Sequence, residues 1–312
     1  MLMSIECAGH PRDMGLAQGA AARTAIRAEV ARLGLPEQRS RIPNLAALTV
    51  GALRGFGAGR EWFRQFAHQA ERLEGLACSA QLPVDSILEL HLRIRAGGEQ
   101  GGLLARRSEV RARTVGGPKD EKRLLLERSL PRAFADEVGW ILRESRPEVG
   151  FRSIEIGLPW LVSSVAGLNE AGLAVVAGPL LWGAPGREGC PTSLLLVQEC
   201  LQRFEDLDGA IDWCCKRPVE GEQSLVLADA SGNVATVVSS GRERRAQWGE
   251  GELHLESGEL SESEGALASQ TSDAADRVWL DPRGKRLRVE LVGSRIEVEL
   301  GDESAVSIPT LR

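Results

Sequence analysis

The spacing of apolar residues divides the chain into a helical N-terminal part and a strand-rich remainder. Residues 11–34 begin at Pro11, carry Ile26 and Val30 about one helical turn apart, and end near Gly34, which predicts an amphipathic helix. Further helices are predicted at residues 62–77, 84–93, 192–204 and 207–216. We therefore expect a helical leader over residues 1–100, packed on a core of residues 101–312 within one integrated domain.

After residue 103 the pattern changes to short apolar runs between turn residues, which predicts strands. The predicted strands are residues 123–128, 140–143, 151–157, 161–168, 173–178, 225–228 and 234–239, followed by a hairpin of 278–280 with 286–292. Residues 249–265 are rich in Glu, Ser and Gly and are expected to form an exposed, mobile loop. Strand runs around two central helices predict an α+β fold in which helices cover antiparallel sheets.

Two hairpins of the same design are the most specific feature of the chain. Residues 167–175 read GLNEAGLAV, where an Asn-Glu-Ala-Gly turn separates two apolar runs. Residues 224–233 read SLVLADASGN and again end an apolar strand in a polar turn. Asn169 and Glu170 lie in the first turn, and Asn tolerates a left-handed backbone there, which favours a structural role. The alternative is that both side chains bind a ligand.

The two hairpins occur in this order with a helix between them that opens at Pro191-Thr192-Ser193. The arrangement resembles the acyl-CoA:isopenicillin N acyltransferase family of N-terminal-nucleophile hydrolases. Residues 9–19, GHPRDMGLAQG, and residues 280–289 are similar to the leader and the late strand pair of that family, so the resemblance spans most of the chain. It implies a four-layer α-β-β-α sandwich with a helical leader, and an amide hydrolase or acyltransferase activity.

In this family a Gly-Cys step begins a strand and the chain cuts itself before the cysteine. The freed α-amine, which titrates near pH ~7.7–8.0, then serves as the base for the thiol. About eighteen residues later the family has an Asn-x-Asp motif that orients nucleophile and substrate. Aligned on residues 124–131, the Asn falls on Ser129, the Asp on Pro131 and the cysteine on Arg113. Ser224 stands where the family tends to have an oxyanion-binding Asn.

Each departure from the family pattern removes a chemical function. Arg113 has no thiol or hydroxyl and offers only hydrogen-bond donors, so it can neither form a thioester nor cut the chain. Pro131 has neither a carboxylate nor a backbone N–H. Ser224 could still donate a hydrogen bond, although losing one oxyanion donor typically costs ~10²–10³ in rate. We therefore predict a pseudoenzyme, in which Arg113 would bind a ligand carboxylate if it faced the former pocket.

Cys190 is the leading alternative nucleophile, because it follows Gly189 and precedes a helix start that could lower the pKa of its thiol. The structural interpretation of this cysteine is favoured. Cys214 and Cys215 are adjacent on a predicted helix and point to different faces, and no Gly-x-Ser-x-Gly elbow occurs. An active amide hydrolase or acyltransferase that uses Cys190 is the second hypothesis, and a structural or partner-binding protein is the third.

Composition restricts the expected partners and location. The net charge of −6 argues against a nucleic-acid surface, and the basic residues 93–113 lack interleaved aromatics and are expected to flank a solvated loop. Residues 156–168 and 171–186 are nearly uncharged but fall short of the ~20 apolar residues of a membrane span. Residues 1–16 lack the apolar core of a secretory signal. Six cysteines without a CxxC and four scattered histidines favour reduced thiols in the cytoplasm, with no metal and no cofactor. The expected partner is a small acyl, amide or peptide ligand.

Overall fold

The computed structural model describes residues 2–38, 64–96, 109–116, 122–130, 139–180, 194–217, 223–240, 243–249, 253–256, 276–291 and 294–300. The helices in this part of the chain are α1 (Pro11–Ala21), α2 (Arg23–Arg32), α4 (Ala67–Ala80), α5 (Val84–Ala96), α7 (Leu195–Arg203) and α8 (Leu207–Lys216). The strands are β1 (Met3–Gly9), β2 (Glu109–Gly116), β3 (Lys122–Leu130), β4 (Ile141–Pro147), β5 (Ser153–Gly157), β6 (Ala166–Asn169), β7 (Ala174–Leu180), β8 (Gln223–Ala228), β9 (Val234–Ser240), β10 (Glu243–Gly249), β11 (Leu253–Glu256), β12 (Asp276–Asp281), β13 (Arg286–Leu291) and β14 (Ser294–Glu299).

These strands form two sheets. The first sheet has eight described strands in the order β1-β4-β5-β6-β7-β8-β9-β10, and the second sheet has six in the order β11-β2-β3-β12-β13-β14. Strand β1 pairs with β4 in parallel, whereas every other described pair is antiparallel. The mixed α+β content with two sheets agrees with the fold class predicted from the sequence.

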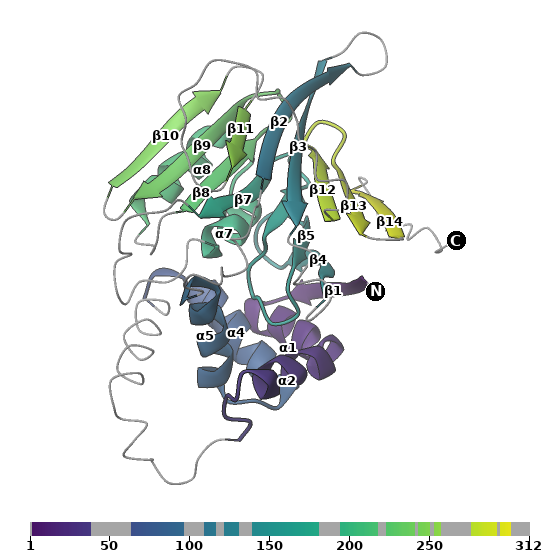
Figure 1. Cartoon of the computed structure of the whole chain (residues 1–312), viewed down its shortest axis with the longest axis vertical. Helices are drawn as coiled ribbons and strands as arrows, with labels where there is room; N and C mark the ends of the chain where they lie inside the picture. Colours follow the sequence, from purple (N-terminus) through teal and green to yellow (C-terminus); the bar gives the residue numbers. More distant parts are fainter. Residues whose placement is uncertain are drawn as a thin grey trace.

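The described helices pack on one face of the first sheet (Figure 1). Helix α1 lies on β1 and β4 and packs closely against α4, α7 lies on β6 and β7, and α8 lies on β9 and β10. Small residues allow the closest approaches. A Cβ on Gly15 of α1 would lie 2.0 Å from the Arg72 carbonyl of α4, and one on Gly167 of β6 would meet Leu201 of α7 at 2.5 Å. Helix α1 joins the N-terminal helices to the sheet, and α7 packs tightly on β6.

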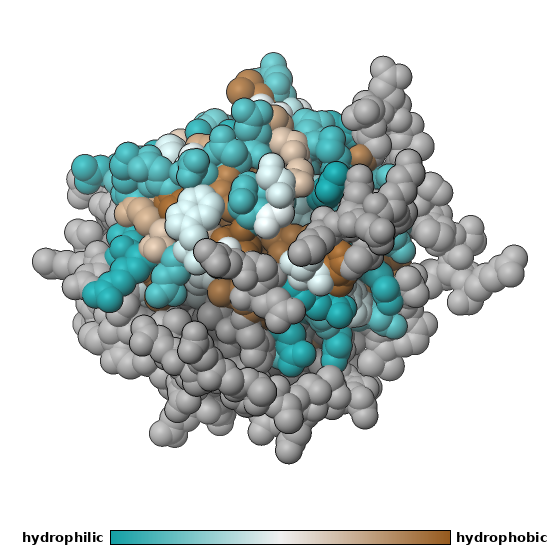
Figure 2. All heavy atoms as spheres, turned by 90° about the horizontal axis from the view of Figure 1, so that it is seen from above, coloured by the Kyte–Doolittle hydropathy of each residue, from teal (hydrophilic) through white to brown (hydrophobic). Residues whose placement is uncertain are grey.

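The other face of the first sheet packs on the second sheet. Strands β2, β3 and β11 contact β7, while β12 and β13 contact β6. We call the buried side chains between the two sheets the inter-sheet layer. Its apolar members are Val110, Ala112, Leu124, Leu126, Leu130, Leu142, Ile154, Ile156, Ala166, Leu168, Ala174, Val176, Val226, Ala228, Val234, Val278, Leu280, Leu287, Val289 and Val298. Seen from above, apolar residues reach the surface in the middle of the molecule and hydrophilic residues surround them (Figure 2).

Both hairpins predicted from turn chemistry are present. Strands β6 and β7 are joined through Gly172 at φ +93°, and β8 and β9 through Gly232 at φ +91°. The first turn touches two others, because a Cβ on Gly172 would lie 2.8 Å from Ala230 and 2.9 Å from the Pro282 carbonyl. Three turns, from both sheets, therefore meet at one corner of the molecule.

Several sequence-based boundaries are wrong for identifiable physical reasons. The helix predicted over residues 11–34 is interrupted at Ala22, which adopts φ −98° and ψ 11° between α1 and α2. The strand predicted at 161–168 begins only at Ala166, because residues 158–165 form a buried apolar loop, and an apolar run does not distinguish such a loop from a strand. Of the basic stretch 93–113, residues 93–96 end α5, residues 109–113 belong to β2 and the residues between lie outside the described part, so its position beside a solvated loop stays a prediction.

The region predicted to be a helical leader also contains a strand, since β1 is an edge strand of the first sheet. Strands β10, β11 and β14 were likewise not predicted. Strand β11 falls inside the expected loop 249–265, of which residues 257–265 lie outside the described part. Within the described residues the layers are helices, first sheet and second sheet. A helical layer over the second sheet stays a prediction.

Candidate functional site

The residue aligned with the family nucleophile, Arg113, lies in the middle of β2 and points away from the first sheet. Its neighbours Val110 and Ala112 are buried in the inter-sheet layer, whereas the Arg113 side chain is 52% exposed on the outer face of the second sheet. The alternation of sides along a strand explains this placement. Arg113 therefore does not face the inter-sheet space, and carboxylate binding by this residue, which depended on its facing the former pocket, stays an untested hypothesis.

On the outer face Arg113 lies among paired charges. It borders a hollow of about 190 Å³, and its Nη2 is 4.0 Å from Glu127. Glu127 also accepts a hydrogen bond from Arg277 at 2.9 Å, and Glu109 pairs with Arg111. Two carboxylates face these three guanidinium groups, so the hollow carries one excess positive charge, and the Arg113 side chain that borders it is half exposed to solvent.

The other aligned positions do not gather around Arg113. Ser129 of β3 accepts a hydrogen bond from the Glu109 backbone N–H at 2.7 Å, which ties β2 to β3. Ser224 of β8 is fully buried in the inter-sheet layer, against Gly178 of β7. Pro131 and Cys190 lie outside the described residues.

Asn169 and Glu170 stabilise the β6–β7 turn. The Asn169 side chain donates to the carbonyls of Leu201 and Phe204 at 2.9 and 2.7 Å and accepts from the Leu173 N–H at 2.9 Å. Glu170 accepts from the Arg152 N–H at 2.9 Å. Asn169 lies on the helix side of the first sheet, so two sheets separate it from Arg113. The three residues proposed together as ligand-binding do not form one site.

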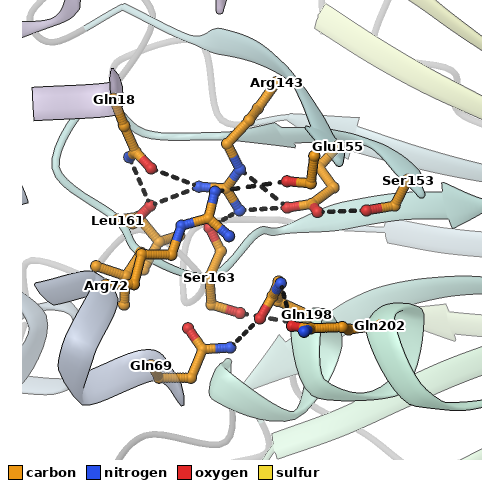
Figure 3. Close-up of polar contacts among 12 residues, drawn as sticks. Gln18, Gln69, Arg72, Arg143, Ser153, Glu155, Leu161, Ser163, Gln198 and Gln202 are labelled. Carbon is orange, nitrogen blue, oxygen red and sulfur yellow. Dashed lines mark hydrogen bonds and ion pairs between the residues drawn. The ribbon is translucent and has the colours of Figure 1, made fainter. Parts of the chain in front are cut away.

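A buried polar network on the helix side of the first sheet was not predicted (Figure 3). At its centre Arg143 of β4 donates to Glu155 of β5 through Nε at 3.1 Å and also through Nη2. Nη1 of Arg143 donates to Oε1 of Gln18 in α1 at 2.9 Å and to the Leu161 carbonyl at 3.1 Å. Ser153 donates to the second Glu155 oxygen at 2.6 Å. The network therefore connects α1, two strands and the buried loop.

Electrostatics in this network favour charged forms despite burial. Burial by itself would raise the pKa of Glu155, but the guanidinium groups of Arg143 and Arg72 and the hydrogen bonds outweigh it, so that this pKa lies below its ordinary value. Arg72 of α4 is buried as well, and burial together with the charge of Arg143 lowers its pKa to about 10. Its Nη2 contacts Ser145 at 3.4 Å, whereas Nε and Nη1 have no hydrogen-bond partner in the described chain.

Arg128 of β3 is a second buried cation, and it lies on the opposite side of the first sheet, in the inter-sheet layer. Its residue is 1% exposed, and Nε, Nη1 and Nη2 all lack hydrogen-bond partners in the described chain. Burial lowers the pKa of Arg128 to about 9, so the side chain is still charged at neutral pH. An uncompensated buried ion costs on the order of several kcal/mol.

A sequence signal for Arg128 existed. Leu124, Leu126 and Leu130 lie at every second position of β3 and are buried, and Arg128 falls in the same alternation. Charged residues are rarely fully buried, so a charged residue among the inward-facing positions of a strand indicates a candidate binding site. No comparable local signal exists for Arg143 and Glu155, whose partners come from distant segments.

His91 is a further buried titratable group, and no chemistry is assigned to it. His91 of α5 is buried, and desolvation lowers its pKa to about 4, so the ring is neutral, with Nδ1 2.8 Å from the Ile87 carbonyl and Nε2 3.2 Å from the Val162 nitrogen. In the described residues no group of three or more His, Cys, Asp or Glu side chains could hold a metal ion. No described helix is both long and apolar enough to cross a membrane.

Comparisons with known proteins give distant likenesses to solved structures. No protein-family model and no curated protein sequence matches the chain. Among solved structures, penicillin V acylase from Agrobacterium tumefaciens is similar at 16% identity and TM-score 0.42 over 61% of this chain and 86% of that chain. A variant of conjugated bile acid hydrolase from Clostridium perfringens is similar at 7% identity and TM-score 0.42, over 65% of this chain and 96% of that chain. An N-acylethanolamine-hydrolyzing acid amidase ortholog from Caenorhabditis elegans is similar at 8% identity and TM-score 0.40, over 56% of this chain and 93% of that chain. At these TM-scores the likenesses carry no argument about this chain.

Proposed function

We propose that this protein is a non-catalytic member of the N-terminal-nucleophile hydrolase group, with a four-layer α-β-β-α sandwich, and that it binds a small acyl or amide ligand. The motifs of residues 9–19, 167–175 and 224–233 support the family assignment. Two stacked sheets with helices on the outside of the first sheet agree with that architecture.

One observation carries the non-catalytic part of the proposal. Strand β2 runs without interruption from Glu109 to Gly116, and residue 113 lies in its middle with an outward side chain. The buried side chains that β2 sends between the sheets are those of Val110 and Ala112, and neither has a nucleophilic atom. An N-terminal nucleophile needs a free α-amine and a thiol or hydroxyl on the same residue. Residue 113 supplies neither.

Mass spectrometry of the purified protein tests this proposal. We expect one species of 33.7 kDa after prolonged incubation at neutral pH, and no release of 4-nitroaniline from N-acyl-amino-acid 4-nitroanilides. Two complementary fragments, or turnover above the uncatalysed rate, would contradict it. If turnover occurs and disappears in Cys190→Ala, the alternative nucleophile is correct and the chain is an enzyme.

We also propose a cytoplasmic location. It is supported by the cysteines at positions 7, 78, 200, 214 and 215, all of which are free thiols in the structure. Cys200 and Cys214 lie with their sulfur atoms 3.4 Å apart without a bond. Thiol titration of protein purified under non-reducing conditions tests this: we expect every cysteine to react after denaturation, and a disulfide would argue for an oxidising compartment.

A further inference from the structure

The contrast between two buried arginines shows that Arg128 lacks a partner. Arg143 and Arg128 are both 1% exposed. Arg143 donates to a carboxylate, a side-chain amide and two backbone carbonyls, so its charge and its N–H groups are satisfied. Arg128 has no hydrogen-bond acceptor for any of its three nitrogens in the described chain. Buried polar groups in proteins are hydrogen-bonded almost without exception, so an acceptor for Arg128 is required.

The surroundings of Arg128 define what the acceptor must look like. Across the ladder its register partners are Val110 on β2 and Val278 on β12, and Leu126 and Leu130 share its side of β3. These side chains are aliphatic and buried. A ligand that fits must therefore combine one hydrogen-bond acceptor group with apolar surface.

The opposite wall of the layer carries small residues among larger aliphatic ones. Ala166 of β6, Ala174 of β7 and Ala228 of β8 face the second sheet. Ala174 lies opposite Ala228 and opposite Leu168, which is on the same side of β6 as Ala166. Gly178 of β7 has no room for a side chain, because a Cβ built on it would lie 2.0 Å from the Oγ of Ser224. Small side chains therefore face the second sheet at these positions, and the Ser224 hydroxyl lies beside Gly178.

We propose that Arg128 anchors a binding site for an apolar monocarboxylate, such as a fatty acid or an acyl-amino acid, between the two sheets. The planar guanidinium matches a carboxylate in a bidentate arrangement, and one negative charge neutralises the single buried positive charge. A phosphate dianion would leave a negative charge in the apolar layer. This inference rests on the proposed function, since it defines the chemistry of the ligand that the non-catalytic protein binds.

Isothermal titration of the full-length protein with octanoate tests the proposal, with octanamide as the neutral isostere. We expect saturable octanoate binding, and octanamide weaker by about tenfold or more, because a hydrogen bond to a charged group is lost. Affinity should rise by about fourfold for each added CH₂ from butyrate to octanoate, since each methylene is buried against aliphatic walls. Equal affinity for octanoate and octanamide, or no binding of either, would overturn the proposal.

The variants Arg128→Leu and Arg113→Leu form a matched pair on neighbouring strands. Arg128→Leu should abolish the preference for octanoate and raise the unfolding midpoint of the ligand-free protein, because an unpaired buried charge is removed. Arg113→Leu, on the outer face, should bind octanoate as the wild type does. Unchanged octanoate binding by Arg128→Leu would overturn the proposal. If Arg128→Leu does not fold, the comparison of octanoate with octanamide on the wild-type protein still tests the proposal.

The two proposals fail in different experiments. Turnover of the nitroanilides would contradict the non-catalytic function and leave the octanoate measurements unaffected. A protein that cuts neither itself nor the substrates, yet does not discriminate octanoate from octanamide, would contradict only the carboxylate site.

Discussion

Replacing Glu155 by glutamine is the sharpest test of the buried network. The substitution keeps the size of the side chain but removes the negative charge that faces Arg143 and Arg72. Glu155 accepts two hydrogen bonds from Arg143 and one from Ser153 at 2.6 Å, and glutamine has only one oxygen with which to replace them. Two buried guanidinium groups would then share no carboxylate.

The expected loss follows from the energetics of buried ion pairs. Removing one partner of such a pair costs about 3–5 kcal/mol, because the other charge is left uncompensated. We therefore expect Glu155→Gln to lower the free energy of unfolding by about 4 kcal/mol, a large part of the 5–15 kcal/mol typical of a folded domain. Urea unfolding followed by circular dichroism measures this, and an unchanged m value indicates that the native fold is retained.

An exposed ion pair supplies the matched control. Asp212 and Lys216 of α8 are 2.7 Å apart with side chains 61% and 72% exposed, so Asp212→Asn should cost less than about 0.5 kcal/mol. The double variant Arg143→Met with Glu155→Leu should recover only part of the loss, because it removes one guanidinium together with the carboxylate but leaves buried Arg72 without that carboxylate. A loss below about 1 kcal/mol for Glu155→Gln would refute the conclusion that this carboxylate neutralises the network.

Three further predictions concern single buried groups. Asn169→Ala should lower the free energy of unfolding by about 3 kcal/mol, since it leaves three backbone groups without their partner; a cost below about 1 kcal/mol in urea unfolding would contradict its structural role. Gly172→Ala should destabilise more than Gly232→Ala in thermal unfolding, because both have positive φ but only the first would bring a Cβ within 3 Å of other atoms; equal effects would argue against the packing of the turns. Burial lowers the pKa of His91 from 6.5 to about 4, so the unfolded chain binds a proton at a higher pH than the folded protein does. The free energy of unfolding should therefore fall by about 3 kcal/mol as the pH drops from 6.5 to 4. Urea unfolding should show that the free energy of unfolding of His91→Gln depends less on pH in this range than that of the wild type. The same pH dependence in both proteins would contradict the lowered pKa of His91.

Local sequence determined much of the secondary structure. The β6–β7 and β8–β9 hairpins follow from turns that need Gly172 and Gly232 at positive φ. Helix α8 begins where Asp206 caps it by accepting from the Gly209 N–H at 2.9 Å, and it was predicted with its observed bounds. Such features depend on residues a few positions apart, so they can be predicted from the order of side chains alone.

Tertiary structure decided which side chains share a space. Arg113 and Arg128 are both strand arginines, and the packing of β2 and β3 on β7 places the first on the outer face and the second in the inter-sheet layer. Arg143 meets Gln18 although 125 positions separate them along the chain. Contacts of this kind depend on strand register and on the stacking of layers, and those are set by the burial of the whole apolar surface rather than by any local pattern.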